Sequence, residues 1–192
     1  MDNLVNTNYT WNELTSACNK CTRCALCRDR TNVVIGRGNP SADVMFVGEG
    51  PGKQEDLQGE PFVGAAGQLL NSALTALRFS QDSYYITNIV KCRPENNREP
   101  VAEEIGACIE WLRIQTRLVQ PKVVVCLGNV ALKTLIDKDM SISKERGNWY
   151  VKKGILFTST YHPAALLRRS ELKQDFWQDL EAVKAKMETL YE

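Results

Sequence analysis

Cysteine is the residue type in this chain whose number and spacing most directly indicate chemistry. Six of the seven cysteines form a pattern of overlapping CxxC pairs near the N-terminus and two distant thiols, namely Cys18, Cys21, Cys24, Cys27, Cys92 and Cys108. A CxxC pair and two distant thiolates supply the four soft ligands that a tetrahedral zinc ion or an iron–sulfur cluster requires. Because the N-terminus lacks the features of a secretory signal, we expect metal binding rather than disulfides and a cytoplasmic location. The spacing alone leaves zinc and iron–sulfur open.

Two other interpretations of the cysteines are weaker. The N-terminal run resembles that of bacterial ferredoxins, in which a fourth cysteine follows after three residues and precedes a proline. Here the last gap is two residues and Arg28 follows, which argues against an electron carrier. Cys126 lies within an apolar run, where we expect a small buried hydrophobic side chain.

The elements that must position these residues alternate between strand-like and helical patterns. Helical patterns cover residues 66–77 and 102–118, and an amphipathic pattern covers residues 173–190. Alternation of this kind predicts a parallel sheet with helices on both faces. The β-rich runs are residues 43–48, 84–88, 122–128 and 155–160.

Length and charge limit the possible functions. The chain has 192 residues with 43% hydrophobic residues, which predicts one domain spanning 1–192 and no membrane span. The formal net charge is only +1, so any nucleic-acid binding must depend on local clusters of Lys and Arg.

The predicted strand ends lead into loops rich in glycine and polar residues. Ligands of parallel sheets bind at the carboxyl ends of the strands, so these loops are the candidate site. The first loop, GEGPG from Gly48, suits a tight turn whose backbone N–H groups approach a polar ligand. It lacks the Lys-Ser/Thr ending of a nucleotide-triphosphate loop and the spacing of a dinucleotide loop, so we expect neither ligand.

Taken together, the motifs resemble the family-four uracil-DNA glycosylases. The resemblance covers most of the chain, with the motifs in the same order and at compatible distances. The motifs are CTRCAL from Cys21, GEGPGKQED from Gly48, GEPFVGAAGQLL from Gly59, YITNIVKCRPENNREP from Tyr85, Cys108, and YHPAALLR from Tyr161.

The resemblance implies a three-layer α/β/α sandwich around a four-stranded parallel sheet. It also implies a four-iron four-sulfur cluster that pins the N-terminal segment to the DNA-facing loops and is held by Cys21, Cys24, Cys92 and Cys108. Cys18 and Cys27 lie outside the family pattern, and Cys18 is the substitute ligand if the register slips. Residues 1–20 lie outside the motifs, and no role can be assigned to them.

The resemblance further implies how uracil is read once it has been flipped out of the DNA stack. Phe62 would stack on the base, and the Asn88 amide would pair with its edge. Gly48 and Gly50 would bring the backbone close to the base. His162, the only histidine, would donate a hydrogen bond to the uracil oxygen that gains negative charge.

Catalysis also requires a positioned water and negative charge near the sugar. The better-known uracil glycosylases carry an aspartate where this chain has Gly50, so we expect Glu49 to orient the water, with Glu55 as the second candidate. Considered alone, Glu55 could equally be a favourable charge at a helix start.

DNA contacts are expected from the last motif and from one lysine. Leu166 takes the position of the apolar wedge that fills the gap left by a flipped base, although alone it would be read as a core residue. Arg168, Arg169 and Lys91 are expected to contact phosphates.

The expected protein is thus a monomeric, monofunctional glycosylase that acts on uracil-containing DNA, single- or double-stranded, and initiates base excision repair. One alternative is a uracil-DNA binding protein with little turnover or with covalent trapping of the product. Trapping relatives use a histidine in an inserted basic loop, whereas residues 144–149 here read KERGNW. The other alternative, an iron–sulfur electron carrier, leaves the strand-exit loops unexplained.

Overall fold

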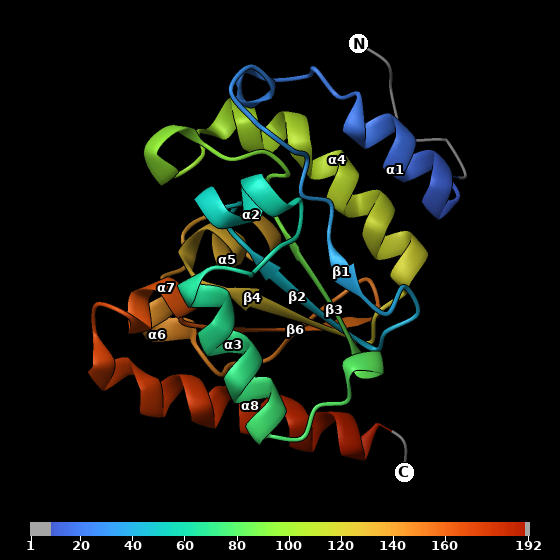
Figure 1. Ribbon diagram of the computed structural model, residues 1–192. Coiled ribbons are helices and arrows are strands. Elements are labelled where there is room, and N and C mark those ends of the chain that lie inside the picture. The colour runs from blue at the N-terminus through green and yellow to red at the C-terminus, as the bar shows by residue number, and fades with distance from the viewer. Residues whose placement is uncertain (1–8, 191–192) are drawn as a thin grey trace.

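The computed structural model describes residues 9–190 and folds them around one mixed sheet (Figure 1). Its strand order is β1-β3-β2-β4-β6-β5. The four central strands are parallel, and β1 and β5 pair antiparallel with β3 and β6 at the two edges. The strands are β1 (Arg37–Gly38), β2 (Val44–Gly48), β3 (Tyr84–Asn88), β4 (Val123–Leu127), β5 (Tyr150–Lys152) and β6 (Ile155–Thr160).

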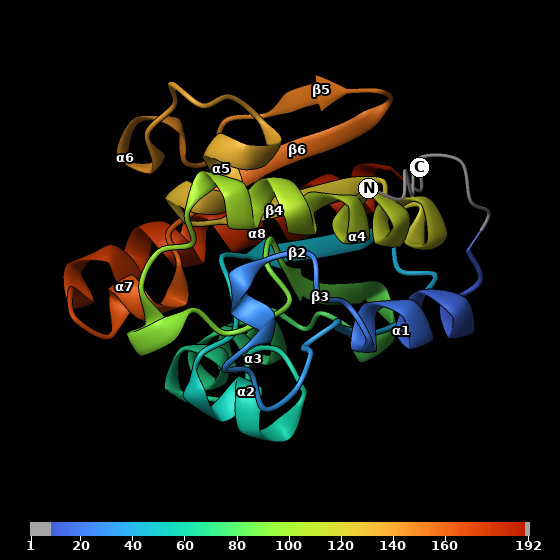
Figure 2. The same ribbon diagram turned by 90° about the horizontal axis from the view of Figure 1, so that it is seen from above.

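The predicted fold class is confirmed, with a correction to the number of strands. The four predicted runs are the parallel centre of the sheet, and two further edge strands extend it. Figure 2 shows β5 beside β6 at one of these edges. Strands of two and three residues are too short to display the alternation by which a strand is recognised in a sequence.

Helices cover both faces of the sheet. The helices α1, α4 and α5 pack on one face, and α3, α7 and α8 pack on the other (Figures 1 and 2). Short α2 and α6 lie in loops. The helices are α1 (Trp11–Asn19), α2 (Lys53–Gln58), α3 (Ala65–Ala76), α4 (Ala102–Val119), α5 (Asn129–Leu135), α6 (Ile142–Glu145), α7 (Pro163–Leu166) and α8 (Lys173–Thr189).

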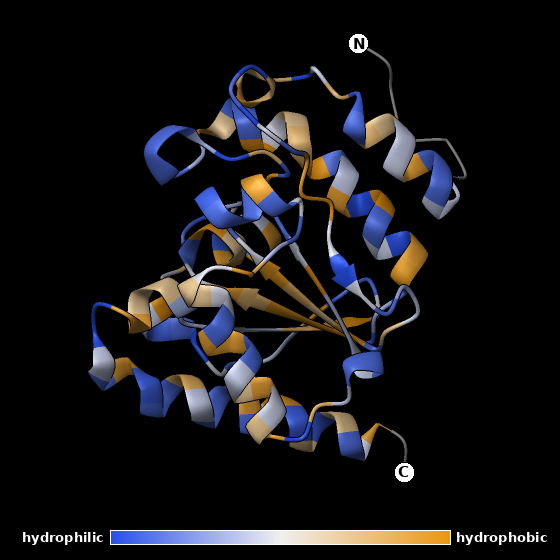
Figure 3. Cartoon of the chain, in the orientation of Figure 1, coloured by the Kyte–Doolittle hydropathy of each residue, from blue (hydrophilic) through white to orange (hydrophobic). Residues whose placement is uncertain are grey.

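The core follows the alternation of side chains along the strands. Val44 and Phe46 of β2 pack with α3 and α8, whereas Met45 and Val47 pack with α1 and α4. Because both faces are covered, every residue of β2, β3 and β4 is buried. Figure 3 shows the apolar strands of the sheet between helices that carry both apolar and polar residues.

The parallel register brings the predicted site loops to one edge of the sheet. Gly48 at the end of β2 pairs with Asn88 at the end of β3, and Leu127 of β4 pairs with Thr160 of β6. The loops after these residues therefore leave the sheet side by side. Gly128 follows β4 at φ +91°, and a Cβ there would lie 2.8 Å from the His162 side chain.

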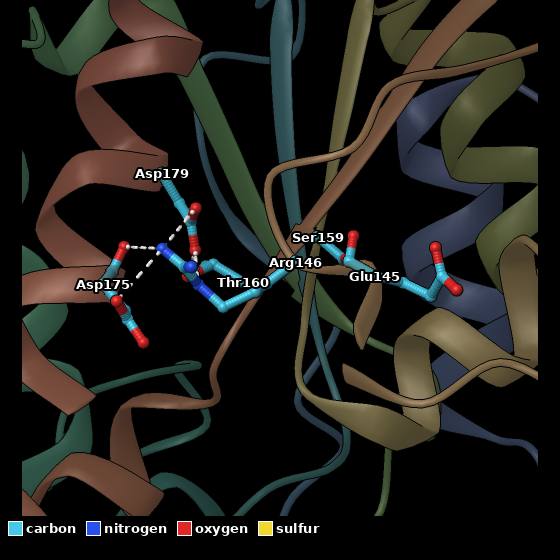
Figure 4. A network of polar contacts seen from close by, with 6 residues as sticks. All are labelled: Glu145, Arg146, Ser159, Thr160, Asp175 and Asp179. Atoms are coloured by element: carbon cyan, nitrogen blue, oxygen red, sulfur yellow. Dashed lines mark hydrogen bonds and ion pairs between the residues drawn. The ribbon is translucent and has the colours of Figure 1, made fainter. Parts of the chain in front are cut away.

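A buried ion pair fixes the end of β6, as Figure 4 shows. Asp179 of α8, which is 7% exposed, accepts a hydrogen bond from the Thr160 hydroxyl at 2.6 Å and from Arg146 Nε at 3.0 Å. Arg146 also donates to the Asp175 carbonyl at 2.8 Å. The loop after α6 is thus tied to both α8 and β6.

Residues 1–8 of the N-terminal segment lie outside the described residues. The part that follows forms α1, which begins at a capping box of Thr10 and Glu13 and buries Leu14 and Cys18. Within residues 9–190, no helix is long and apolar enough to cross a membrane.

Candidate active site and cysteine-lined site

One pocket of about 510 Å³ opens at the carboxyl edge of the sheet. The loop after β2, the start of α3, the loop after β3 and α7 line it, so the predicted convergence of the strand-exit loops is present in the fold. The lining includes Glu49, Gly50, Lys53, Glu55, Phe62, Asn88, Arg98, His162 and Arg168.

Asn88 presents an unsatisfied polar atom to this region. Its side chain is 2% exposed, and its Oδ1 is a buried oxygen without a hydrogen-bond partner. Leaving such an acceptor unpaired costs about 1–3 kcal/mol, which a ligand N–H would recover. Gly48 is required beside it, because a Cβ there would lie 2.4 Å from Oδ1 and 2.6 Å from the Phe62 ring.

Phe62 and His162 provide two rings close to Asn88. Their centroids are 5.7 Å apart, with an angle of 34° between the planes. Phe62 has a φ of 56°, a left-handed conformation that is strained for a bulky side chain. Gly67 permits it, since a Cβ at Gly67 would lie 1.9 Å from the Phe62 carbonyl oxygen.

Glu55 holds the same turn from the other side. Its Oε1 accepts hydrogen bonds from the backbone N–H groups of Val63 at 2.9 Å and Gly64 at 2.8 Å. These two bonds lie immediately after Phe62 and before α3. The Glu55 carboxylate therefore positions the turn that carries Phe62.

His162 is a neutral hydrogen-bond donor in this arrangement. Burial lowers the pKa of His162 to about 4, so the imidazole is uncharged at neutral pH. Its Nδ1 accepts the backbone N–H of Ala164 at 3.2 Å at the start of α7. The proton therefore resides on Nε2, which is free to donate to a ligand.

Glu49 is a carboxyl group in the pocket whose pKa lies near neutrality. Burial, followed by the negative charge of Glu99, raises the pKa of Glu49 to about 7. A carboxylate with such a pKa can accept a proton from water near physiological pH. The pocket thus combines an amide, two rings, a neutral donor and a basic carboxylate.

Comparisons with known proteins identify the family. The family model for the uracil DNA glycosylase superfamily matches residues 35–181. The chain belongs to the uracil DNA glycosylase superfamily. It is 45% identical over 172 residues to a Type-4 uracil-DNA glycosylase of Thermotoga maritima, covering 86% of this chain and 88% of that protein. It is 42% identical over 171 residues to the Type-4 enzyme of Archaeoglobus fulgidus, covering 85% and 86%.

Two of the residues predicted to contact DNA are buried in this structure. Lys91 is 1% exposed, so it cannot reach a phosphate; its Nζ instead donates to Thr87 Oγ1 at 2.7 Å and to the Asn88 carbonyl at 2.6 Å. Leu166 is 1% exposed and belongs to the core under α3 and α8, so its side chain does not project from the surface as a wedge would. The neighbouring Leu167 is 52% exposed.

The cations at the pocket are only partly those predicted. Arg168 lines the pocket as expected, whereas exposed Arg169 pairs with Glu171 at 2.9 Å and is not part of the lining. Lys53 and Arg98 line the pocket but were missed by the sequence reasoning. Their positions in the sequence could have indicated them, because both lie in motifs that follow the predicted strand ends.

The six patterned cysteines gather at a second site. They line one small cavity together with Arg30, Lys91 and Trp111, among others. Three sulfur atoms accept hydrogen bonds there. The bonds are Arg30 NH1 to Cys92 Sγ at 3.3 Å, Lys91 N to Cys108 Sγ at 3.3 Å and Trp111 Nε1 to Cys21 Sγ at 3.4 Å.

The residues around this cavity fit an anionic thiolate centre. N–H donors to sulfur are typical of cysteines that ligate iron–sulfur clusters. Burial lowers the pKa of Lys91 to about 8, and the thiolate charges of Cys108, Cys18 and Cys92 act in the opposite direction.

In residues 9–190, no three metal-binding side chains form a site for a single metal ion. Cys126 is buried in β4, as expected of a small hydrophobic residue.

Proposed function

We propose that this protein is a monofunctional uracil-DNA glycosylase. It hydrolyses the N-glycosidic bond of flipped-out deoxyuridine, releases uracil and leaves an abasic site, which initiates base excision repair. The observation that carries the proposal is the buried, unpaired Asn88 Oδ1 beside the rings of Phe62 and His162. The similarity to Type-4 uracil-DNA glycosylases supports it.

Uracil recognition follows from the hydrogen-bonding edge of the base. The Asn88 amide accepts from the ring N–H of uracil through Oδ1 and donates to the adjacent carbonyl through its NH₂ group. Cytosine presents the opposite pattern, which would leave buried groups unpaired. Phe62 stacks on the base, and Gly48 and Gly50 keep side chains out of the space that it occupies.

Bond cleavage produces negative charge on uracil and positive character on the sugar. His162 donates a hydrogen bond from Nε2 to the uracil oxygen that gains charge, which stabilises the departing anion. Glu49 orients the water and takes its proton. Glu55 supports Phe62 from behind through the backbone N–H groups of Val63 and Gly64.

DNA is held by cations around the pocket. Lys53 and Arg168 are exposed, line the pocket and neutralise phosphates of a strand whose base has entered it. Arg98 also lines the pocket, but its guanidinium is already paired with the Glu104 carboxylate at 2.6 Å. Leu167 takes the role of the apolar wedge, because it is exposed beside Arg168 whereas Leu166 is not. We propose that one copy of the chain, a single domain, acts alone and in the cytoplasm, where free thiols persist.

The cysteine-lined site is proposed to hold a four-iron four-sulfur cluster on Cys21, Cys24, Cys92 and Cys108. When bound, such a cluster would cross-link the N-terminal segment, the loop after β3 and α4 through these four thiolates. The anaerobically purified protein should then be brown, with broad absorption near roughly 400 nm. A colourless protein with stoichiometric zinc would refute the cluster.

The decisive test of the activity is excision from an end-labelled single-stranded oligonucleotide that contains one uracil. The reaction contains chelator to exclude magnesium-dependent nucleases, and a matched strand carries cytosine. Breakage that is specific to uracil and appears only after alkali would support a monofunctional glycosylase. Tight retention of the uracil strand without breakage would show a binding module instead.

A further inference from the structure

Lys91 carries a buried charge for which the surrounding carboxylates provide no partner. It is among the largest fully buried side chains, and within residues 9–190 no carboxylate forms an ion pair with it. A buried ammonium is very unfavourable unless negative charge and hydrogen-bond acceptors compensate it. The protein must therefore supply that charge from another source.

The groups next to Lys91 that can carry negative charge are thiols. Lys91 lines the cysteine cavity, its backbone N–H donates to Cys108 Sγ at 3.3 Å, and Cys92 is its neighbour in the chain. Cys18 is buried on the α1 side of the same cavity. Thiolates that bind a cluster would place net negative charge beside this ammonium.

The same ammonium holds the strand that reads the base. Lys91 Nζ donates to Thr87 Oγ1 at 2.7 Å and to the Asn88 carbonyl oxygen at 2.6 Å. Thr87 Oγ1 is itself fixed, because it donates to the Ile35 carbonyl at 2.7 Å. The main chain of Asn88 is thus tied to the cysteine site, while its side-chain Oδ1 remains unpaired.

We propose that Lys91 is a positioning residue that couples the cysteine-bound cluster to uracil recognition. The cluster holds the ammonium in place by charge, and the ammonium fixes the Asn88 main chain so that its amide meets the base. The inference rests on the proposed cluster and glycosylase function. It gives the cluster a role in selecting the base as well as in stabilising the fold.

The test replaces the charge with an apolar chain of similar length, K91M, in the cluster-containing protein. Two quantities are measured. The first is the rate of iron release to a chelator, and the second is the uracil preference, defined as the affinity for a strand with uncleavable 2′-fluorodeoxyuridine divided by that for the matched thymine strand. The division cancels general DNA binding.

Both quantities should change in K91M. Loss of a charged partner should speed iron release about 10-fold and lower the uracil preference about 10-fold. A change in only one of them, or in neither, would overturn the coupling. Absence of iron from the wild-type protein would instead refute the cluster, and absence of excision by the wild type would refute the activity.

A second pair of variants keeps the test decisive if K91M does not fold. T87V removes one acceptor of the ammonium but keeps its charge, and T87S keeps the hydroxyl. The uracil preference should fall in T87V and be restored in T87S, with iron release close to that of the wild type in both. Equal uracil preference in T87V and T87S would overturn the proposal.

Discussion

Glu49 and His162 line the same pocket with pKa values that burial moves in opposite directions. Burial disfavours the charged form of each, which raises the pKa of the carboxyl to about 7 and lowers that of the imidazole to about 4. Near neutral pH, His162 is therefore an uncharged donor and Glu49 titrates. Such divergence of two pKa values assigns the acceptor and donor roles.

The pH profile of excision should report Glu49. Since the carboxylate is the active form and its pKa is about 7, kcat/KM should rise with pH and level off above that value. His162 stays neutral above a pH of about 5, so its titration does not change kcat/KM in that range. Measurement of kcat/KM from acidic to alkaline pH should show the rise in the wild type, and its persistence in E49Q would contradict the assignment.

Glu55 should act through its oxygen acceptor and not through its charge. E55Q keeps an oxygen for the N–H groups of Val63 and Gly64 and should retain most of the activity, whereas E55A should lose about 10-fold or more in kcat/KM. Steady-state kinetics on both variants provide the comparison. If E55Q is as impaired as E55A, Glu55 must take part in proton transfer.

The two adjacent leucines of the last motif should behave differently. L167A should lower excision from duplex DNA about 10-fold with little loss from single strands, because a wedge acts only where a base pair has opened. Its stability should stay within about 0.5 kcal/mol of the wild type. L166A is the matched control and should cost about 2–5 kcal/mol of unfolding free energy, since it leaves a cavity in the core. The reverse pattern would restore Leu166 as the wedge.

At the scale of elements, β6 and α7 are positioned by contacts outside the pocket. Thr160 ends β6 two residues before His162, and its hydroxyl is held by Asp179 of α8. Arg146, from the loop after α6, completes the pair and lies over the Tyr161 ring at 5.9 Å. Contacts among α8, β6 and the loop after α6 thus determine where the His162 side chain lies.

Replacement of Arg146 should lower the free energy of unfolding. R146M leaves the Asp179 carboxylate buried with only the Thr160 hydroxyl, so unfolding free energy should fall by about 3 kcal/mol. Urea denaturation measures the change. K144M, which alters an exposed residue of α6 two positions before Arg146, should stay within about 0.5 kcal/mol of the wild type. Equal stability of the two variants would contradict a structural role for the pair.

At the scale of the whole molecule, DNA binding must depend on the placement of charge. The formal net charge is +1, yet three exposed cations border one pocket at the carboxyl edge of the sheet. A protein with so little net charge attracts DNA through this local field and not from a distance.

The salt dependence of DNA binding should identify this surface. R168Q should weaken binding to uracil-containing and normal single strands alike and reduce the slope of log K against log salt by about 0.7. K184Q is the control, because Lys184 lies over Phe79, before β3, at the opposite end of the sheet. Fluorescence anisotropy at several salt concentrations measures both. An unchanged slope in R168Q would remove Arg168 from the DNA contacts.

Sequence alone determined the four central strands and the edge of the sheet at which the pocket opens. Parallel strands must end at the same edge of a sheet, so Gly48, Asn88 and His162 were bound to meet once the four strands were recognised. The four cysteines predicted as ligands line one cavity, which Cys18 and Cys27 also line.

Only the tertiary structure decided which neighbouring side chain faces inward. Leu166 and Leu167 are chemically identical, and the packing of α7 against α3 and α8 buries one and exposes the other. The sequence predicted that Lys91 contacts phosphates, but in the fold its side chain is buried. The sequence could not show that Glu55, the second candidate for orienting the water, accepts a hydrogen bond from the turn after Phe62. Burial and partnership depend on residues far apart in the sequence, and for that reason no local pattern could assign them.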